Sequence, residues 1–348
     1  AGDQTELHHN NLFHELLSAT GGYTQRWGNP SFEGGLFASL GTYGTLSSVN
    51  DYDDLLRSRL IILWGCDPAN TIHETNTTWY LIRAKEAGTK IIAVDPRYTN
   101  SAAILARQWI PVFPGTDTAM LLAMAYVLIQ KGLYDQDFLN AYTVGFDRFR
   151  DYVLGVEDVQ PKSPSWAARV TGVTEKVIEN LAIEYATTKP AALIAGISPG
   201  RTAYGEQFHR TAKTLAAMTG NIGISGGWAG RSFAPSVRSG GFDFKFGRVS
   251  WTEDNPADAG APRREDGLST QKGAASSARM HLSEIPEALL KGKAGGYPAD
   301  LKMILVMHTN PVNQYPNTNK LLQGLKKLEF IAVAEQVLKK VETLKGTV

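Results

Sequence analysis

The sequence predicts an α/β protein with two doubly wound domains, each built on a mainly parallel sheet. Short apolar runs of strand length alternate along the chain with segments of helical composition, the order that parallel sheets require. Loops of Gly, Pro, Asp and Thr follow the first two runs, as is typical of the ligand-binding ends of parallel strands. The expected strands are 60–64, 90–94, 108–112, 191–195, 301–307 and 330–334.

The order of these segments also predicts how the domains are arranged. We expect residues 49–189 to form an inserted, Rossmann-like nucleotide-binding domain, and residues 1–48 with 190–348 to form a discontinuous α/β domain. Residues 23–44 are dense in Gly, Ser and aromatic residues without periodicity, so they are expected to be a loop. Residues 230–278 are polar and rich in Gly, Ser, Arg and Asp, which predicts a surface excursion.

Composition limits the possible functions. The 348 residues are 43% hydrophobic and 20% charged, which is enough for two domains with cores. A formal charge of +1 gives no electrostatic reason to expect a nucleic-acid partner. No export signal and no membrane-spanning run is visible. The single cysteine, Cys66, excludes an internal disulfide and a Cys-ligated cluster within this chain.

The loops after the first two strands have the chemistry of a nucleotide site. Gly65 permits close backbone approach, and Asp95 follows the second strand, where a carboxylate can accept a hydrogen bond from a ribose hydroxyl. Arg97 and Thr99 can contact a phosphate. The first loop is nevertheless not the Gly-x-Gly-x-x-Gly of nicotinamide and flavin binders, because Cys66 follows Gly65. An ordinary βαβ unit with tight turns remains an alternative.

Three motifs in order identify a resemblance. Trp-Gly-Cys-Asp-Pro at 64–68, Val-Asp-Pro-Arg-Tyr-Thr at 94–99 and Pro-Gly-Thr-Asp at 114–117 resemble the molybdopterin oxidoreductases of the dimethyl sulfoxide reductase family, especially their anaerobic, membrane-complex catalytic subunits. The resemblance implies the fold of the central part of these enzymes. It also implies that the loops bind the bis(molybdopterin guanine dinucleotide) molybdenum cofactor, with Asp95 and Asp117 near its guanosine end. Capping of the following helix is an alternative role for Asp117.

Further residues follow from the resemblance. In the family a serine oxygen ligates molybdenum shortly after a Gly-Gly-Tyr like that at 21–23, which implies that Ser31 is the catalytic metal ligand. A turn hydrogen bond is the plainer role for Ser31, and a solvated turn is the plainer role for 196–201. The residues that the resemblance places at the cofactor are Trp64, Gly65, Asp67, Pro68, Asp95, Arg97, Thr99, Gly115, Asp117, Gly200, Arg201 and Asn310.

The implied function is reduction of a small S- or N-oxide by oxygen-atom transfer in anaerobic respiration. The family's subunits dock to an iron-sulfur electron-transfer subunit and a membrane anchor on the periplasmic face of a bacterial inner membrane. Many members also carry a Cys-rich iron-sulfur segment, which this chain lacks. We therefore expect the chain to be a piece of a larger subunit, and to be inactive and without cofactor when isolated.

Two other function classes are considered. A structural relative without functional molybdenum, of the type of the large subunit of respiratory complex I, would have the same fold and act as an electron relay. Retention of the three loops, with Ser31 in place, argues against it. An unrelated nucleotide-binding dehydrogenase is disfavoured because the glycine fingerprint is missing after Leu63.

Overall fold

The computed structural model describes residues 16–28, 31–44, 50–71, 76–228, 230, 255–261, 278–307, 309–315 and 317–334. Its internal contacts divide the chain into two compact units, Ser31–Gly241 and a second unit made of Ala1–Pro30 with Phe242–Val348. The Ser31–Gly241 unit contains the four-stranded sheet, and the other described sheets have two strands each.

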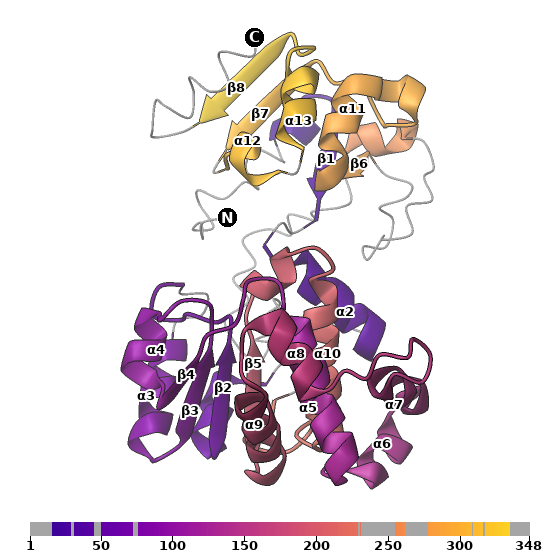
Figure 1. The fold of residues 1–348 in the computed structure, drawn as a ribbon. Helices are drawn as coiled ribbons and strands as arrows, with labels where there is room; N and C mark the ends of the chain where they lie inside the picture. The colour runs from indigo at the N-terminus through magenta and orange to yellow at the C-terminus, as the bar shows by residue number, and fades with distance from the viewer. Residues whose placement is uncertain are drawn as a thin grey trace. The chain divides into compact units, whose positions relative to one another are not determined.

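A four-stranded parallel sheet forms the centre of the Ser31–Gly241 unit (Figure 1). Its strand order is β4-β3-β2-β5, and the strands are β2 (Leu60–Trp64), β3 (Lys90–Val94), β4 (Gln108–Ile110) and β5 (Ala191–Ala195). Leu60 pairs with Lys90 on one side and with Ala191 on the other. Three of these strands have the predicted bounds, and β4 is two residues shorter than expected because the chain leaves the sheet after Ile110.

Helices cover both faces of this sheet, as the doubly wound prediction requires. Side chains alternate along β2, so Leu60, Ile62 and Trp64 enter one core cluster while Ile61 and Leu63 enter another. The first cluster is formed with α5 (Asp117–Lys131), α8 (Pro164–Thr171), α9 (Glu175–Thr187) and α10 (Glu206–Met218). The second is formed with η2 (Tyr52–Arg57), α3 (Thr77–Glu86) and α4 (Asn100–Leu105). The short helices α6 (Gln136–Tyr142) and α7 (Phe146–Leu154) follow α5 in the chain.

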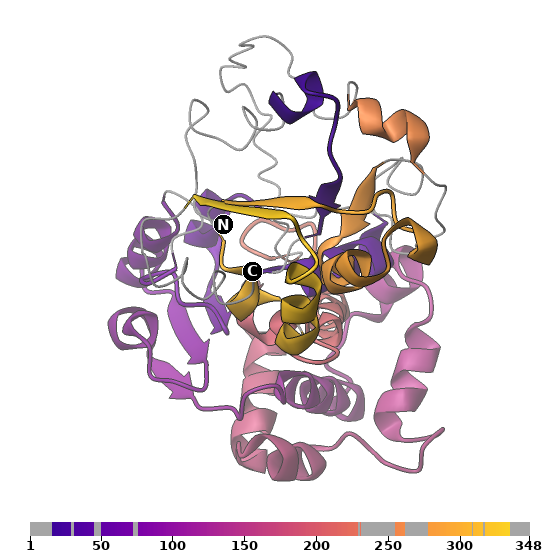
Figure 2. The same ribbon diagram turned by 90° about the horizontal axis from the view of Figure 1, so that it is seen from above.

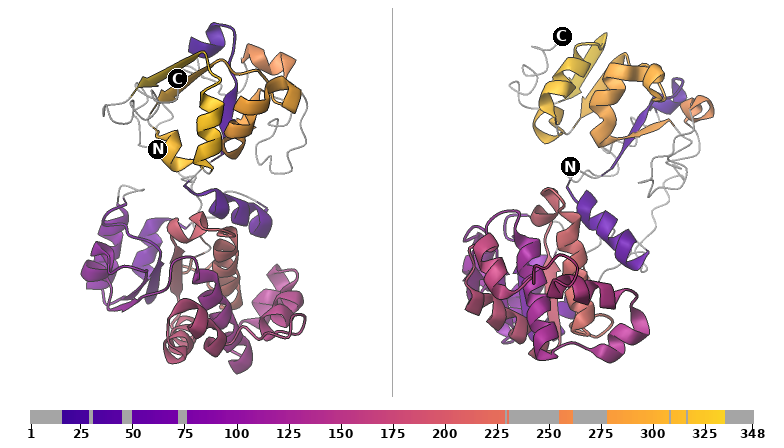
Figure 3. Two further views of the ribbon diagram at one scale, coloured as in Figure 1. Left: turned by 45° about the horizontal axis from the view of Figure 1, so that its top comes forward. Right: turned by 45° about the vertical axis from the view of Figure 1, so that its right-hand side comes forward.

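The expected loop over residues 23–44 is wrong for most of its length. It contains the strand β1 (Gln25–Trp27) and an eleven-residue helix, α2 (Glu33–Tyr43). Helix α2 packs against α10 (Figures 1 and 3), and its buried positions are small residues, Gly35, Ala38 and Ser39. Because no large apolar side chain marks this face, the helix has no hydrophobic periodicity that a sequence pattern could reveal.

The second unit contains two short parallel strand pairs. Strand β1 pairs with β6 (Arg279–His281), and β7 (Met303–Met307) pairs with β8 (Phe330–Ala334), which Figure 2 shows side by side. Its core is formed with α11 (Ile285–Lys291), α12 (Pro311–Gln314) and α13 (Thr318–Leu325). Of the expected excursion over 230–278, the structure describes η4 (Pro256–Gly260) and its immediate neighbours, and the rest lies outside the described residues.

The two units do not share their boundaries with the two expected domains. Strand β5 pairs with β2 along all five residues, so the chain just after Pro190 lies in the same sheet as residues 60–110. Helix α2 likewise belongs to the Ser31–Gly241 unit, through its packing against α10. Among the described residues, no helix is both long and apolar enough to cross a bilayer.

Candidate functional site

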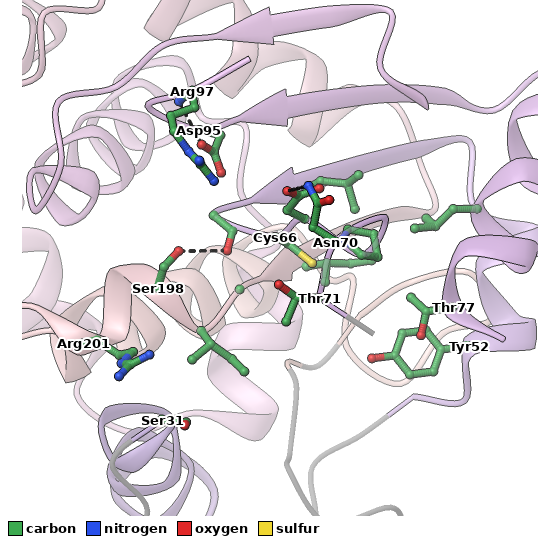
Figure 4. Close-up of a pocket in the computed structure, with 18 residues that line it drawn as sticks. Ser31, Tyr52, Cys66, Asn70, Thr71, Thr77, Asp95, Arg97, Ser198 and Arg201 are labelled. Carbon is green, nitrogen blue, oxygen red and sulfur yellow. Dashed lines mark hydrogen bonds between the residues drawn. The ribbon is translucent and has the colours of Figure 1, made fainter. Parts of the chain in front are cut away.

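A pocket of about 330 Å³ opens where β2, β3 and β5 end (Figure 4). The chain after β2 continues to β3 on one side, whereas β5 lies on the other side, so the strand order reverses between β2 and β5. Loops that leave neighbouring strands in opposite directions open a crevice at that point, which is where open α/β sheets bind ligands. The pocket therefore has the position that this topology favours for a binding site.

The turns after β2 and β5 form the floor of the pocket, and they pack backbone to backbone. Gly65 adopts a φ of +56° and its N–H donates to the carbonyl of Val94 over 2.8 Å. Gly196 donates its N–H to the carbonyl of Trp64 over 2.7 Å. A Cβ on Gly196 would collide with the Gly65 carbonyl, so this approach requires glycine. Ser198 Oγ donates to that same carbonyl over 3.1 Å.

Asp67 is held as a carboxylate by the loop around it. Its oxygens accept from Ser101 Oγ and Asn70 Nδ2, each over 2.6 Å, and from the Ser101 N–H over 3.3 Å. Partial burial raises the pKa of Asp67, but these hydrogen bonds and the Arg97 charge outweigh burial and hold the pKa below its ordinary value. Asp67 therefore fixes the shape of the loop and carries a negative charge at neutral pH.

Asp95 lies in a different environment from Asp67. Burial raises the pKa of Asp95, and the nearby Asp67 carboxylate adds to this effect, against the Arg97 N–H that donates to Asp95 Oδ1 over 2.9 Å. Asp95 and Arg97 lie at one end of the pocket, with Tyr52 and Thr77 at the other (Figure 4). A half-buried carboxylate with a raised pKa is suited to accept hydrogen bonds from a ligand that enters and donates to it.

Seven of the predicted residues line this pocket. They are Ser31, Gly65, Asp67, Pro68, Asp95, Arg97 and Arg201. Ser31 and Arg201 are far from the others in sequence, and Figure 4 shows Ser31 below Arg201 at the edge of the site. The tertiary structure thus brings together the first motif loop, the second motif loop and the loop after β5.

The other predicted residues do not line the pocket. Trp64 is buried and donates its Nε1–H to Asp117 Oδ1 over 2.9 Å, so this pair is internal. Thr99 caps α4 by accepting from the Ala102 N–H over 3.1 Å. Gly115 has a φ of +79° in the turn before α5.

Two residues remain from the predicted set. A Cβ on Gly200 would collide with the His209 imidazole, so Gly200 contributes a close approach of the chain to α10. Asn310 belongs to the second unit, where its carbonyl accepts from the Gln314 N–H over 3.0 Å at the start of α12. The role predicted for Asn310 at the cofactor stays a prediction.

A model of one protein family matches nearly the whole chain. The description of the family is "Molybdopterin oxidoreductase", and the match covers residues 2–341. The chain belongs to the molybdopterin oxidoreductase family. This confirms the resemblance identified from the three motifs, and it excludes an unrelated dehydrogenase.

Several curated relatives of this molybdopterin oxidoreductase are similar in sequence. A dimethyl sulfoxide reductase of Escherichia coli is 36% identical over 71% of this chain and 31% of its own length. A trimethylamine-N-oxide reductase of Haemophilus influenzae is 30% identical over 93% of this chain and 40% of its own. A dimethyl sulfoxide/trimethylamine N-oxide reductase of Rhodobacter capsulatus is 31% identical over 92% and 40%, respectively. The chain thus spans 31–40% of the length of these relatives.

The fold of the chain is also found in a solved structure. The acetylene hydratase of Pelobacter acetylenicus matches 93% of this chain and 43% of its own, with a TM-score of 0.56 at 17% sequence identity. At that identity the similarity concerns the fold alone. It confirms the predicted α/β architecture with parallel sheets for this molybdopterin oxidoreductase.

Membership of this family implies a molybdenum-pterin cofactor, and the pocket suits part of such a group. Its volume is at the lower end of the range for small-molecule sites, about 300–1,000 Å³. That is room for a nucleotide-sized portion of a cofactor. The exposed guanidinium groups of Arg97 and Arg201 suit phosphates, and the glycine turns at Gly65 and Gly196 leave the floor free of side chains.

Several pocket residues of this molybdopterin oxidoreductase were missed by the sequence reasoning. Asn70 and Thr71 lie in the loop after β2 and Ser198 lies in the loop after β5, so a search of every residue in these loops would have included them. Tyr52 and Thr77 begin η2 and α3, and no sequence signal links them to the site. They line the pocket because both elements pack on the same face of the sheet.

Proposed function

We propose that this chain is the central cofactor-binding portion of the catalytic subunit of a molybdenum oxidoreductase. The full subunit reduces a small S- or N-oxide by oxygen-atom transfer in anaerobic respiration. The observation that carries the proposal is the pocket at the switch point between β2 and β5, where Gly65, Asp95, Arg97 and Arg201 lie together. The curated relatives named for dimethyl sulfoxide and trimethylamine N-oxide support the substrate class.

The proposed cofactor is the guanine dinucleotide form, bis(molybdopterin guanine dinucleotide) molybdenum. Arg97 and Arg201 bind its phosphates, because a guanidinium can donate two parallel hydrogen bonds to a phosphate. Asp95 accepts from the guanosine portion, and Ser31 provides an oxygen ligand to the metal. Trp64, Pro68, Thr99, Gly115, Asp117 and Gly200 hold the loops in shape, and Asn310 contacts the pterin.

Bound molybdenum would supply two-electron chemistry, in which the S- or N-oxide loses its oxygen, two electrons and two protons are taken up, and water and the reduced product leave. The side chains of this chain position the cofactor and limit the access of solvent. No general base of the chain is needed. None of the described histidines lines the pocket, since His209 and His281 lie elsewhere in the fold.

The partners and location are part of the same proposal. Electrons arrive from an iron-sulfur electron-transfer subunit that is held by a membrane anchor on the periplasmic face of a bacterial inner membrane. An iron-sulfur cluster of the catalytic subunit itself would be bound outside this chain, which has one cysteine. The isolated chain is expected to lack cofactor and activity, because a site with missing walls is not pre-organised.

The test measures cofactor content and activity of the full-length subunit. Arg97→Gln is expected to lower molybdenum and released guanine nucleotide together by about 10-fold or more, since a hydrogen bond to a charged group contributes about 1.5–3 kcal/mol. Arg83→Gln is the matched control, because Arg83 lies on α3, pairs with Glu86 over 2.8 Å and does not line the pocket. Its cofactor content should equal that of the wild type.

Ser31→Ala separates the metal ligand from the nucleotide site. It should retain guanine nucleotide while it loses oxide reductase activity and changes the electron paramagnetic resonance signal of Mo(V). An unchanged signal and activity would contradict the ligand role of Ser31. Iron without molybdenum in the purified full-length protein would contradict the whole proposal and favour the electron-relay alternative.

A further inference from the structure

A second, much smaller cavity lies on the face of β5 opposite the cofactor pocket. Ile194 lines the cofactor pocket, whereas the neighbouring Leu193 and Ala195 line the small cavity. Helix α10 closes it with His209 and Lys213, and Trp228 and Gly230 contribute to its remaining wall. The cavity has room for about one water-sized particle.

Two of the buried polar side chains at this cavity have a nitrogen without a hydrogen-bond partner among the described residues. Trp228 is 1% exposed, and its Nε1–H, which can only donate, has no partner among the described residues. Nε2 of His209, which is 3% exposed, has no partner there either. Lys213 is 3% exposed and donates to Ser39 Oγ over 2.5 Å. Two of its three ammonium protons are left for another acceptor.

The charge of Lys213 has no acidic partner in the part of the chain that the structure describes. Helix α2 faces Lys213 with Ser39 and with the ring of Tyr43, which lies 5.2 Å from Nζ. Helix α10, which carries Lys213, also carries His209. Burial and the Lys213 charge lower the pKa of His209 to about 3. Burial lowers the pKa of Lys213 to about 8, so at pH 7 the lysine is charged while the imidazole is neutral.

Lys162 is a second buried lysine, and its hydrogen-bond partners differ from those of Lys213. It is also 3% exposed, but its Nζ donates to Asp158 Oδ2 and to the Gln160 carbonyl, each over 2.6 Å. A buried ammonium group without a counter-charge is costly, because the protein interior solvates charge poorly. Among the described residues, Lys213 therefore lacks the acidic partner that Lys162 has.

We propose that the small cavity binds one monovalent anion of halide size, which is the counter-ion of Lys213 and accepts from Trp228 Nε1–H and His209 Nε2–H. A water molecule fits the space, but it leaves the ammonium charge uncompensated. The neutral imidazole of His209 can carry its proton on Nε2 and so donate to the anion. This inference is independent of the proposed function.

The position of the anion gives it a structural role. Ala195 immediately precedes Gly196 in the pocket floor, and the His209 imidazole lies so close to Gly200 that a Cβ there would collide with it. An anion that neutralises Lys213 and binds His209 thus holds α10 in contact with the loop that carries Arg201. Its removal should loosen that loop.

Diffraction from crystals grown in potassium bromide tests the site directly. An anomalous difference peak is expected within hydrogen-bond distance of Lys213 Nζ and Trp228 Nε1. A peak without anomalous signal, which indicates water, would overturn the proposal. An acidic side chain of the chain in that position would also overturn it.

Thermal unfolding tests the site in solution. Replacing potassium gluconate by potassium bromide at equal ionic strength should raise the wild-type Tm by about 2–4 °C, since a ligand that binds only the folded state stabilises it. Lys213→Met should abolish this rise. Lys162→Met, the matched buried lysine, should keep it. Equal halide responses in all three proteins would show that no such site exists.

A milder variant covers the case in which Lys213→Met does not fold. Trp228→Phe keeps an aromatic ring and removes only the Nε1–H donor. It should need about 10-fold more bromide for the same rise in Tm, because one hydrogen bond to an anion is lost. An unchanged bromide dependence would contradict the participation of Trp228 and, with an empty anomalous map, the site itself.

Discussion

Trp64 donates its indole Nε1–H to Oδ1 of Asp117 over 2.9 Å, and so ties the end of β2 to the first turn of α5. Trp64 is fully buried and Asp117 is 5% exposed. The two residues come from the first and third motif loops, so the contact holds the two loops in a fixed relation. Trp64 and Asp117 shape the pocket from within the fold.

Breaking this pair is expected to destabilise the protein. Trp64→Phe leaves the buried Asp117 carboxylate without its donor, and Asp117→Ala leaves the indole N–H without its acceptor. Each change should cost about 1–3 kcal/mol from the lost hydrogen bond alone. A double-mutant cycle by urea unfolding should give a coupling energy of about 1 kcal/mol or more. Additive single effects would show that the contact contributes little.

The stability contribution of Asp117 should depend on pH. Burial raises the pKa of Asp117 above its ordinary 3.8, against the hydrogen bond from Trp64. The folded protein therefore holds this proton more tightly than the unfolded chain, and stability falls as the pH rises through the raised folded value. The free energy of unfolding of the wild type, relative to Asp117→Asn, should decrease between pH 4 and pH 7. A constant or increasing difference would contradict the raised pKa.

Gly196→Ala should damage the pocket floor. The added Cβ would collide with the backbone carbonyl of Gly65, which cannot rotate away, so we expect a loss of about 3 kcal/mol in the free energy of unfolding. Gly41→Ala on α2 is the control, because nothing lies within 4 Å of its added Cβ. That helical glycine should stabilise the protein by about 0.5–1 kcal/mol when replaced. Comparable effects of the two variants would argue against the close approach.

Ser101→Ala should loosen the loop that carries Asp67. Ser101 Oγ donates to Asp67 Oδ1 over 2.6 Å and accepts from the Ala69 N–H over 2.9 Å, so its loss leaves two loop groups unpaired. The expected cost is about 1–3 kcal/mol. Ser165→Ala, which removes only a 3.3 Å contact with the exposed Arg169, should change stability by less than about 0.5 kcal/mol.

The stability cost of Ser101→Ala should depend on pH. Because Asp67 has a lowered pKa in the folded state, its contribution to stability is present above its ordinary 3.8 and is lost as the pH falls through the lowered value. Ser101→Ala removes a cause of that lowering, so the stability difference from wild type should shrink in acid. Carbon-detected nuclear magnetic resonance of the Asp67 carboxyl should show its pKa rise. An unchanged pKa would contradict the role of Ser101.

The sequence by itself determined the central strands. β2, β3 and β5 have the predicted bounds, since strands of a parallel sheet that are covered by helices read as uninterrupted apolar runs. The partly exposed strand β8 of the second unit also begins and ends where predicted. It also determined which loops carry Gly65, Asp95 and Arg97, because these residues directly follow the strands. The three motifs sufficed to indicate the family that the comparison confirms.

Only the tertiary structure decided the rest. Helix α2 forms because small side chains let it approach α10, and no apolar pattern records such packing. Strand β5 joins β2, so the fold rather than the chain order decides which strands share a sheet. Long-range packing also brings Ser31, Tyr52 and Arg201 to the pocket and buries Trp64 against Asp117. Sequence patterns report local periodicity, whereas a site is made by contacts between residues that are distant in the chain.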